Sequence, residues 1–154
     1  MTFHSEFLAQ SVFEIGRDSG LPQRSYEHPK RIPMLVAAWL FLALVHLTPA
    51  AVLVRPDLIR SLYAVEAAGD LGVLLIHRGA LFAALVVVCL YAAWEPSARR
   101  AAALVVAISV VSFLVIYASA GAPSGSLRMI ALADLVALAP LALVTWKAWQ
   151  SQKS

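Results

Sequence analysis

Long apolar segments separated by short polar ones dominate the chain from residue 33 onward. Four of them are almost free of charged residues: 33–54, 71–94, 101–120 and 127–149. About 20 helical residues cross a hydrocarbon core of about 30 Å, and a helix satisfies its own backbone hydrogen bonds in lipid. The pattern therefore predicts an all-α fold, an integral membrane bundle of four transmembrane helices within residues 33–149.

Two further segments are more polar and are expected to lie outside the hydrocarbon core. Residues 1–32 contain no apolar run long enough for a signal peptide, so we expect a polar N-terminal extension in the cytoplasm. A short amphipathic helix and a weakly ordered tail are the alternatives there, because apolar residues recur at helical spacing: Phe3, Phe7, Leu8, Val12, Phe13 and Ile15. In 55–70, Pro56 and Asp57 are placed as at a helix start, which predicts a short helix at the outer membrane interface.

Composition and charge agree with this architecture and add an orientation. The chain is 61% hydrophobic and 14% charged, with a mean hydropathy of +0.79 and a net charge of +3. Lys and Arg accumulate in cytoplasmic loops of membrane proteins. One side of the predicted bundle carries eight of these residues and the other carries four: Arg17, Arg24, Lys30, Arg31, Arg99, Arg100, Lys147 and Lys153, against Arg55, Arg60, Arg78 and Arg128. A composition rich in Ala, Leu, Val and Arg indicates a bacterial source. We therefore expect a multi-pass protein of the bacterial inner membrane, with both termini cytoplasmic and no nucleic-acid partner.

The chain lacks the sequence motifs of soluble enzymes. G-x-S-x-G, H-E-x-x-H and phosphate-binding glycine loops are absent, which favours a non-enzymatic role. The single cysteine, Cys89, has no partner for an intramolecular disulfide and is expected to be a small packing residue. Trp39, Trp94, Trp146 and Trp149 are expected to be mostly anchors at the membrane interfaces.

The apolar segments contain few polar side chains, and several of these lie at one depth. Counting 1.5 Å per residue from the outer end of each helix places four of them about 9 to 12 Å deep: His46, His77, Ser112 and Asp134. Arg78 follows His77 directly. Ionisable residues in transmembrane helices usually face the bundle interior and mark a function or a buried pair. The five residues therefore predict a polar layer, a candidate ligand-binding pocket open toward the periplasm.

Several uses of this polar layer stay open. In the simplest, Asp134 pairs with Arg78 or with a protonated histidine and only fixes helix packing, and snorkelling to the headgroups explains Arg78 alone. His46 and His77 suit a pair of axial ligands to haem iron. With Asp134 they also suit a zinc or iron site. Ionisable groups in a membrane fit proton or small-solute handling as well.

Four short motifs resemble a family of small bacterial four-helix membrane proteins: HLTP at 46–49, IHRGALF at 76–82, VVSFLV at 110–115 and MIALADLVAL at 129–138. The resemblance covers roughly residues 46–143, and the family pattern corresponds here to His46, Pro49, His77, Arg78, Ser112 and Asp134. Members often carry the label phosphopantetheine adenylyltransferase, an activity that needs a soluble α/β domain and a paired-histidine motif, and this sequence contains neither. The chain also departs from the family in its polar N-terminal extension and in Ile76, where the family tends to have a basic residue. The resemblance therefore implies the architecture and the polar layer rather than that activity.

These observations favour a non-enzymatic inner-membrane protein, a small accessory or interaction subunit that packs against a larger membrane assembly. The polar extension, the short loops and the lack of a sizeable extramembrane domain motivate this hypothesis. The expected partners are the lipid bilayer and other membrane subunits, or further copies of the chain. The alternative is a haem-binding or metal-binding electron-transfer protein, or one that handles protons or small solutes, through His46, His77 and Asp134.

Overall fold

The computed structural model describes residues 32–150, and this part of the chain is all-helical, with no strand. It contains five α-helices and two 3-10 turns in the order α2 (Ile32–Ala50), η1 (Ala51–Leu53), α3 (Leu58–Tyr63), α4 (Gly69–Trp94), η2 (Pro96–Ala98), α5 (Arg99–Ser119) and α6 (Ser126–Gln150). The prediction of an all-α fold is confirmed for these residues. The expected extension over residues 1–32 lies outside them, apart from Ile32.

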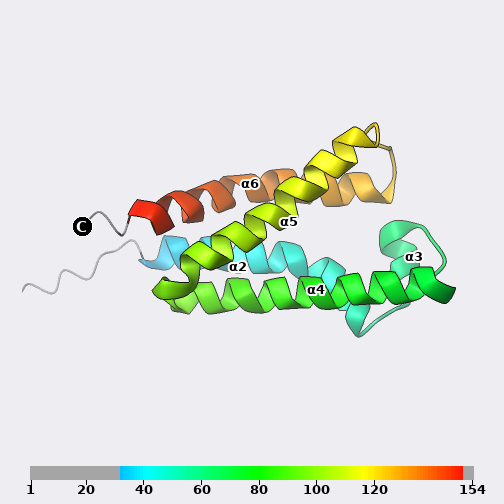
Figure 1. Cartoon of the computed structure of the whole chain (residues 1–154), viewed down its shortest axis with the longest axis horizontal. Helices are drawn as coiled ribbons and strands as arrows, with labels where there is room; N and C mark the ends of the chain where they lie inside the picture. The colour runs from blue at the N-terminus through cyan, green and yellow to red at the C-terminus, as the bar shows by residue number, and fades with distance from the viewer. Residues whose placement is uncertain (1–31, 151–154) are drawn as a thin grey trace, which may run out of the picture.

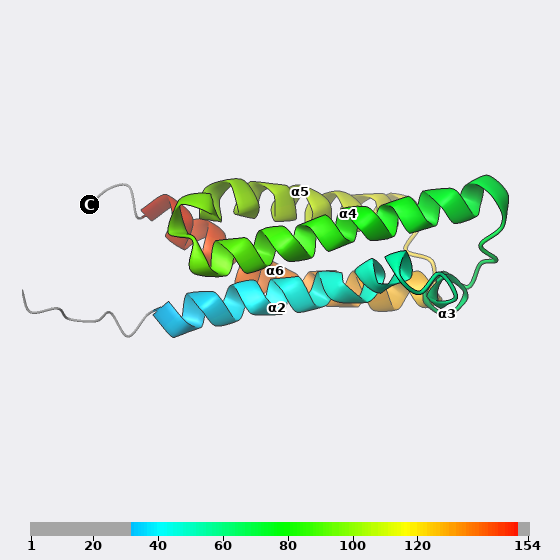
Figure 2. The same cartoon turned by 90° about the horizontal axis from the view of Figure 1, so that it is seen from below.

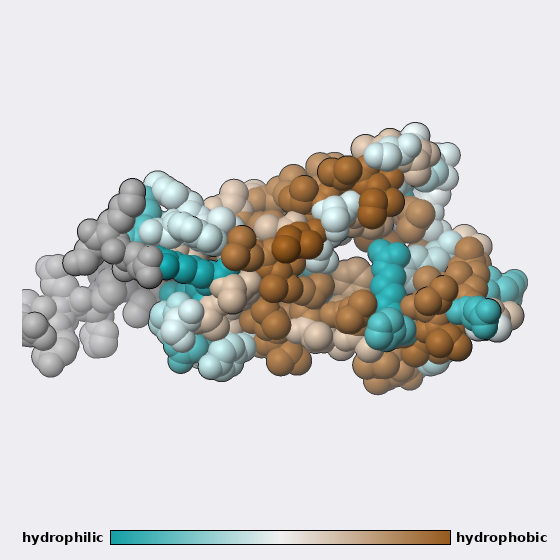
Figure 3. Space-filling model, in the orientation of Figure 1, coloured by the Kyte–Doolittle hydropathy of each residue, from teal (hydrophilic) through white to brown (hydrophobic). Residues whose placement is uncertain are grey.

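Four of the described helices are long and apolar enough to cross a membrane. The candidate spans are Pro33–Leu53, Gly69–Trp94, Pro96–Ser119 and Ser126–Gln150. Many of their outward side chains are exposed leucines, valines and isoleucines, and Figure 3 shows this as a hydrophobic middle between more hydrophilic ends. No membrane is part of the structure, and the four helices suggest a multi-pass membrane protein because an outer surface this apolar is unfavourable in water.

The long helices pack in the order α4, α2, α6, α5 around the bundle. Helix α2 runs along both α4 and α6, and α5 runs along α6, whereas α5 approaches α4 near η2 and diverges from it toward the other end (Figures 1 and 2). The start of α2, the end of α6 and η2 lie together at one end, called here the η2 end. Helix α3 and the α5–α6 connection lie at the other, called here the α3 end. The bundle is therefore closed at the η2 end and opens toward the α3 end.

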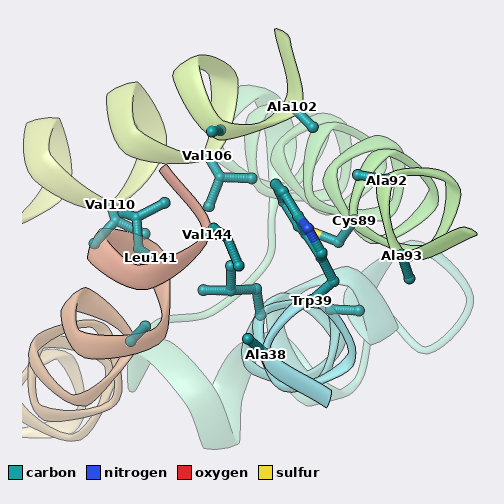
Figure 4. Packing of buried hydrophobic residues seen from close by; sticks show 14 residues of the cluster. Ala38, Trp39, Cys89, Ala92, Ala93, Ala102, Val106, Val110, Leu141 and Val144 are labelled. Carbon is teal, nitrogen blue, oxygen red and sulfur yellow. The ribbon is translucent and has the colours of Figure 1, made fainter. Parts of the chain in front are cut away.

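The η2 end is filled by a cluster of small apolar residues around one large one. Trp39 is fully buried, and Figure 4 shows its indole reaching from α2 toward Val106 and Val144 on one side and Cys89 and Ala92 on the other. Small side chains let helices approach closely, which is how membrane helices gain packing contacts. Cys89 is a buried packing residue, as predicted.

The four tryptophans were expected to be mostly interface anchors, and Trp39 is not one of them. Trp94, Trp146 and Trp149 are exposed, whereas Trp39 has no exposed surface. The reason is its position on α2, the helix that packs against both α4 and α6 and has the largest buried share of the four spans.

Two arginines close the helix ends at η2. Arg99 donates hydrogen bonds from Nε to the Ala92 carbonyl (3.0 Å) and from Nη2 to the Ala93 carbonyl (3.2 Å). Arg100 donates from Nε to the Ala148 carbonyl (2.9 Å). The last carbonyls of a helix have no partner within it and carry partial negative charge, so both guanidinium groups are well placed. The arginine pair that the sequence presents as a topology signal thus also stabilises α4 and α6.

The α3 end is shaped by a change of helix type and a close helix approach. After Pro49, α2 gives way to the 3-10 turn η1, and a short helix, α3, follows in the segment where one was expected. Gly79 lets α4 approach η1, because a Cβ added there would lie 2.9 Å from the Leu53 backbone nitrogen. This close contact sets the position of α4 at Gly79 and therefore that of its neighbour Arg78.

Candidate functional site

A cavity of about 360 Å³ lies among the helices at the α3 end. All five described helices contribute a polar side chain to its wall: His46 from α2, Tyr63 from α3, Arg78 from α4, Ser109 from α5 and Asp134 from α6. The remaining wall is largely apolar. Pockets of roughly 300 Å³ or more with a few convergent polar groups are typical of small-molecule sites. We refer to this cavity as the polar pocket.

Arg78 is surrounded by aromatic rings. Its guanidinium carbon lies 5.6 Å from the ring centre of Tyr63, 5.3 Å from that of Phe82 and 5.7 Å from that of Phe113. Ring faces attract a cation, yet they leave most of the five N–H donors of an arginine without a hydrogen-bond acceptor. Within residues 32–150, the Arg78 side chain has no hydrogen-bond acceptor and no carboxylate within 4.0 Å. Its donors therefore remain available to a ligand.

Asp134 lines the same pocket and is likewise unpaired. No donor from the described residues bonds its carboxyl group, and no cation there lies within 4.0 Å of it. The ion pair with Arg78, one of the alternatives left open by the sequence, makes no contact within 4.0 Å, although both groups line one cavity and Arg78 attracts Asp134 across it. A carboxyl group in an apolar environment without partners is unfavourable, so its placement calls for water or a ligand as partner.

His46 is the deepest polar group of the pocket, with only 2% of its surface exposed. Its Nδ1 lies 2.7 Å from the Leu42 carbonyl, and since a carbonyl only accepts, Nδ1 carries the hydrogen. In the neutral ring, Nε2 is then an acceptor, and no donor in the described part of the chain bonds it. One turn later, Pro49 has no N–H, so the Val45 carbonyl on the pocket wall lacks its helical donor.

Tyr63 contributes a phenol to the pocket wall. Burial raises the pKa of this phenol above its ordinary value, and the nearby charge of Arg78 lowers it to a smaller extent. The hydroxyl stays protonated at neutral pH and can donate a hydrogen bond. Hydropathy did not predict this residue at the pocket, because its place depends on how the loop before α4 folds back against the bundle.

The structure brings together three of the five residues of the predicted polar layer: His46, Arg78 and Asp134. His77 does not line the pocket and is exposed, because neighbouring positions of a helix point about 100° apart. Ser112 lines a neighbouring hollow that also includes Arg78, and its hydroxyl donates to the Ser109 carbonyl (3.2 Å). Depth was predictable by counting residues, whereas the direction of each side chain was not.

Residues 32–150 do not bring together the ligands that a metal or haem site would need. No group of three or more His, Cys, Asp or Glu side chains there is arranged to hold a metal ion. His46 faces the pocket and His77 faces outward, so the two rings do not face a common axial site.

A second hollow, called here the lateral groove, lies between α4 and α5 beside the polar pocket. The two share four wall residues: Arg78, Phe82, Ser109 and Phe113. The rest of the groove is mostly apolar and includes Leu81, Leu85 and Ile116. Figure 3 shows a hollow next to strongly hydrophilic surface in this otherwise hydrophobic region. The groove follows from the divergence of α5 from α4.

Comparisons of the chain with protein-family models, curated proteins and solved structures give no match. The resemblance carried by the short motifs around His46, Arg78 and Asp134 stays a prediction.

Proposed function

We propose that the chain is a multi-pass membrane protein that acts by binding a small molecule in the polar pocket rather than by catalysis. The observation that carries this proposal is the convergence of unpaired polar groups: the Arg78 guanidinium, the Asp134 carboxyl and His46 Nε2. Groups that only fixed helix packing would bond one another, whereas these three reach the same cavity without a hydrogen bond between them.

Binding in a pocket that is open on one side only is favoured over a path through the membrane. Between the pocket and the η2 end, the bundle interior is filled by the apolar cluster around Trp39, Val106 and Leu141. A proton or solute path needs polar groups to continue it. The pocket therefore suits a molecule that enters and leaves on one side.

We place the protein in a bacterial inner membrane with the η2 end in the cytoplasm. The support is the excess of Lys and Arg on that side of the sequence. In a Cys89→Ala background, a cysteine at Ser124 in the α5–α6 connection is expected to react with an impermeant maleimide from the periplasm. A matched cysteine at Ser97, in η2, is expected to react only after lysis. The reverse pattern would overturn the orientation.

A role as accessory subunit of a larger assembly is compatible with ligand binding. It is supported by the broad exposed apolar face of α4, which includes Leu74, Leu81 and Val87. Such a face suits a partner helix as well as lipid.

Native mass spectrometry of the full chain, gently released from its own membranes, tests the proposal. We expect a stoichiometric bound mass of small-molecule size that is lost in Asp134→Asn and retained in Arg60→Gln, a change of an exposed arginine outside the pocket. Protein companions in addition would support the accessory role. A chain without bound mass, or with the same mass in both variants, would contradict ligand binding in the pocket.

A further inference from the structure

The polar pocket presents one cation and two acceptors on different walls. Arg78, on the α4 wall, offers planar N–H donors that match a phosphate or carboxylate. Asp134 on the α6 wall and His46 Nε2 on the α2 wall offer acceptors. Because Arg78 and Asp134 make no contact within 4.0 Å, one ligand that satisfies both must carry an anionic group and a hydrogen-bond donor.

The wall shared with the lateral groove gives such a ligand a second, apolar part. Phe82 and Phe113 border both hollows, and Arg78 belongs to both. Beyond them the groove continues along Leu81, Leu85 and Ile116 between two helices whose outer faces are apolar. A hydrocarbon chain lying in this groove leaves its head at Arg78. A wholly polar solute would leave the groove unfilled.

We propose that the ligand is a membrane amphiphile with a phosphoethanolamine-type head, loaded sideways through the lateral groove between α4 and α5. Its phosphate bonds Arg78, its ammonium bonds Asp134 and His46, and its chain lies against Phe82, Phe113 and Ile116. This inference rests on the proposed function and adds the ligand class and the route of entry.

Three probes test separately the contributions of the ammonium N–H groups and of the hydrocarbon chain to binding. The full chain is stripped of lipid in a maltoside detergent and titrated with lysophosphatidylethanolamine, with lysophosphatidylcholine and with free phosphoethanolamine, and bound mass is followed by native mass spectrometry. The first probe is expected to bind one to one. The second, whose ammonium has no N–H, is expected to bind at least tenfold more weakly, because it cannot donate a hydrogen bond to Asp134 or His46. The third lacks the chain and is expected to bind at least tenfold more weakly than the first.

Two pocket variants assign the contacts. Arg78→Gln is expected to weaken both lysolipids about tenfold or more. Asp134→Asn is expected to weaken the ethanolamine form about tenfold and the choline form less, so that the preference between the two lysolipids falls. If Arg78→Gln does not fold, Asp134→Asn still tests the headgroup assignment. General destabilisation would not remove the preference for one lysolipid over the other. Unchanged affinities in Asp134→Asn would overturn the assignment.

A matched pair of α5 variants tests the groove. Ile116→Trp fills the groove, and Ile108→Trp makes the same change on the same helix outside both hollows; the two isoleucines are 66% and 68% exposed. We expect at least a fivefold loss of lysophosphatidylethanolamine binding in the first and none in the second. Equal binding in both variants would overturn sideways loading.

The remaining outcomes separate this inference from the proposed function. Equal binding of phosphoethanolamine and of its lysolipid would show that the pocket takes a soluble solute, which overturns the amphiphile and leaves the pocket function standing. If none of the three probes binds, but the native protein carries a bound mass that Asp134→Asn loses, the amphiphile is likewise overturned and the pocket function stands. A native protein without any bound mass would contradict both the amphiphile and the pocket function.

Discussion

The two ends of the bundle use their arginines in opposite ways. At the η2 end, Arg99 and Arg100 donate to the last carbonyls of α4 and α6, and the interior beside them is packed around Trp39. At the α3 end, Arg78 faces a cavity with three rings around it and no acceptor among the described residues. The first arrangement serves the fold, and the second leaves hydrogen-bonding capacity for something outside the chain. The comparison thus separates polar groups that hold the bundle together from those that are free to bind.

Removal of the central side chain of the packed η2 end should have the largest effect on stability. Trp39→Ala leaves a cavity among small residues that cannot fill it, so we expect a loss of about 3 to 5 kcal/mol in the free energy of unfolding. Denaturation in mixed micelles measures it. Trp94→Ala, at a tryptophan that is 66% exposed, is the control and should cost far less. Equal losses would mean that the η2 end is not the packed core.

A larger side chain at the close contact beside Arg78 should have the second-largest effect on stability. Gly79→Ala puts a Cβ 2.9 Å from the Leu53 nitrogen, so α4 must move away from η1, at a cost of about 1 to 3 kcal/mol. Because Arg78 moves with it, ligand content should fall as well. Ala84→Val, on an exposed position of the same helix, should change neither quantity. A stable Gly79→Ala protein with full ligand content would show that this contact does not position the pocket.

Loss of a helix-end arginine should have the smallest of these effects. Arg99→Gln removes charge-assisted bonds to the Ala92 and Ala93 carbonyls, and we expect a loss of about 1 to 2 kcal/mol with ligand content unchanged. Arg128→Gln, at an exposed position at the α3 end, should have almost no effect on unfolding. A loss of ligand in Arg99→Gln would break the division of roles between the two ends.

The sequence predicted the helices well because the thickness of the hydrocarbon core sets the minimum length of a membrane-spanning helix. A run such as 71–94 must be helical in lipid, and residue counting predicted one level for His46, His77, Ser112 and Asp134, of which His46 and Asp134 line the polar pocket. Helix rotation was not predictable in the same way. In a soluble protein the apolar stripe marks the buried face, whereas here both the core side and the lipid side of a helix are apolar.

This ambiguity explains the particular errors. His77 and Arg78 are adjacent in sequence, and nothing in the surrounding leucines shows which of them points inward; only the approach of Gly79 to η1 settles it. Trp39 resembles an interface anchor for the same reason, until the packing of α2 between α4 and α6 is known. Tyr63 and the lateral groove depend on how a loop returns and how two helices diverge, which hydropathy does not encode.

The central claim is that the polar groups of the pocket serve a ligand and not the fold, and Asp134→Asn tests it most directly. The measurement is the unfolding temperature of delipidated wild-type and variant protein, before and after addition of lipid extract from the native membranes. We expect equal stability within about 1 kcal/mol before addition, because Asp134 makes no hydrogen bond or contact ion pair in the described part of the chain and Arg78 attracts it only from across the cavity. After addition the wild type should gain about 2.7 kcal/mol at a ligand concentration of 100 Kd, whereas a variant that binds about tenfold more weakly should gain only about 1.4 kcal/mol. A variant that is strongly destabilised without lipid, and that gains as much as the wild type with it, would contradict the claim.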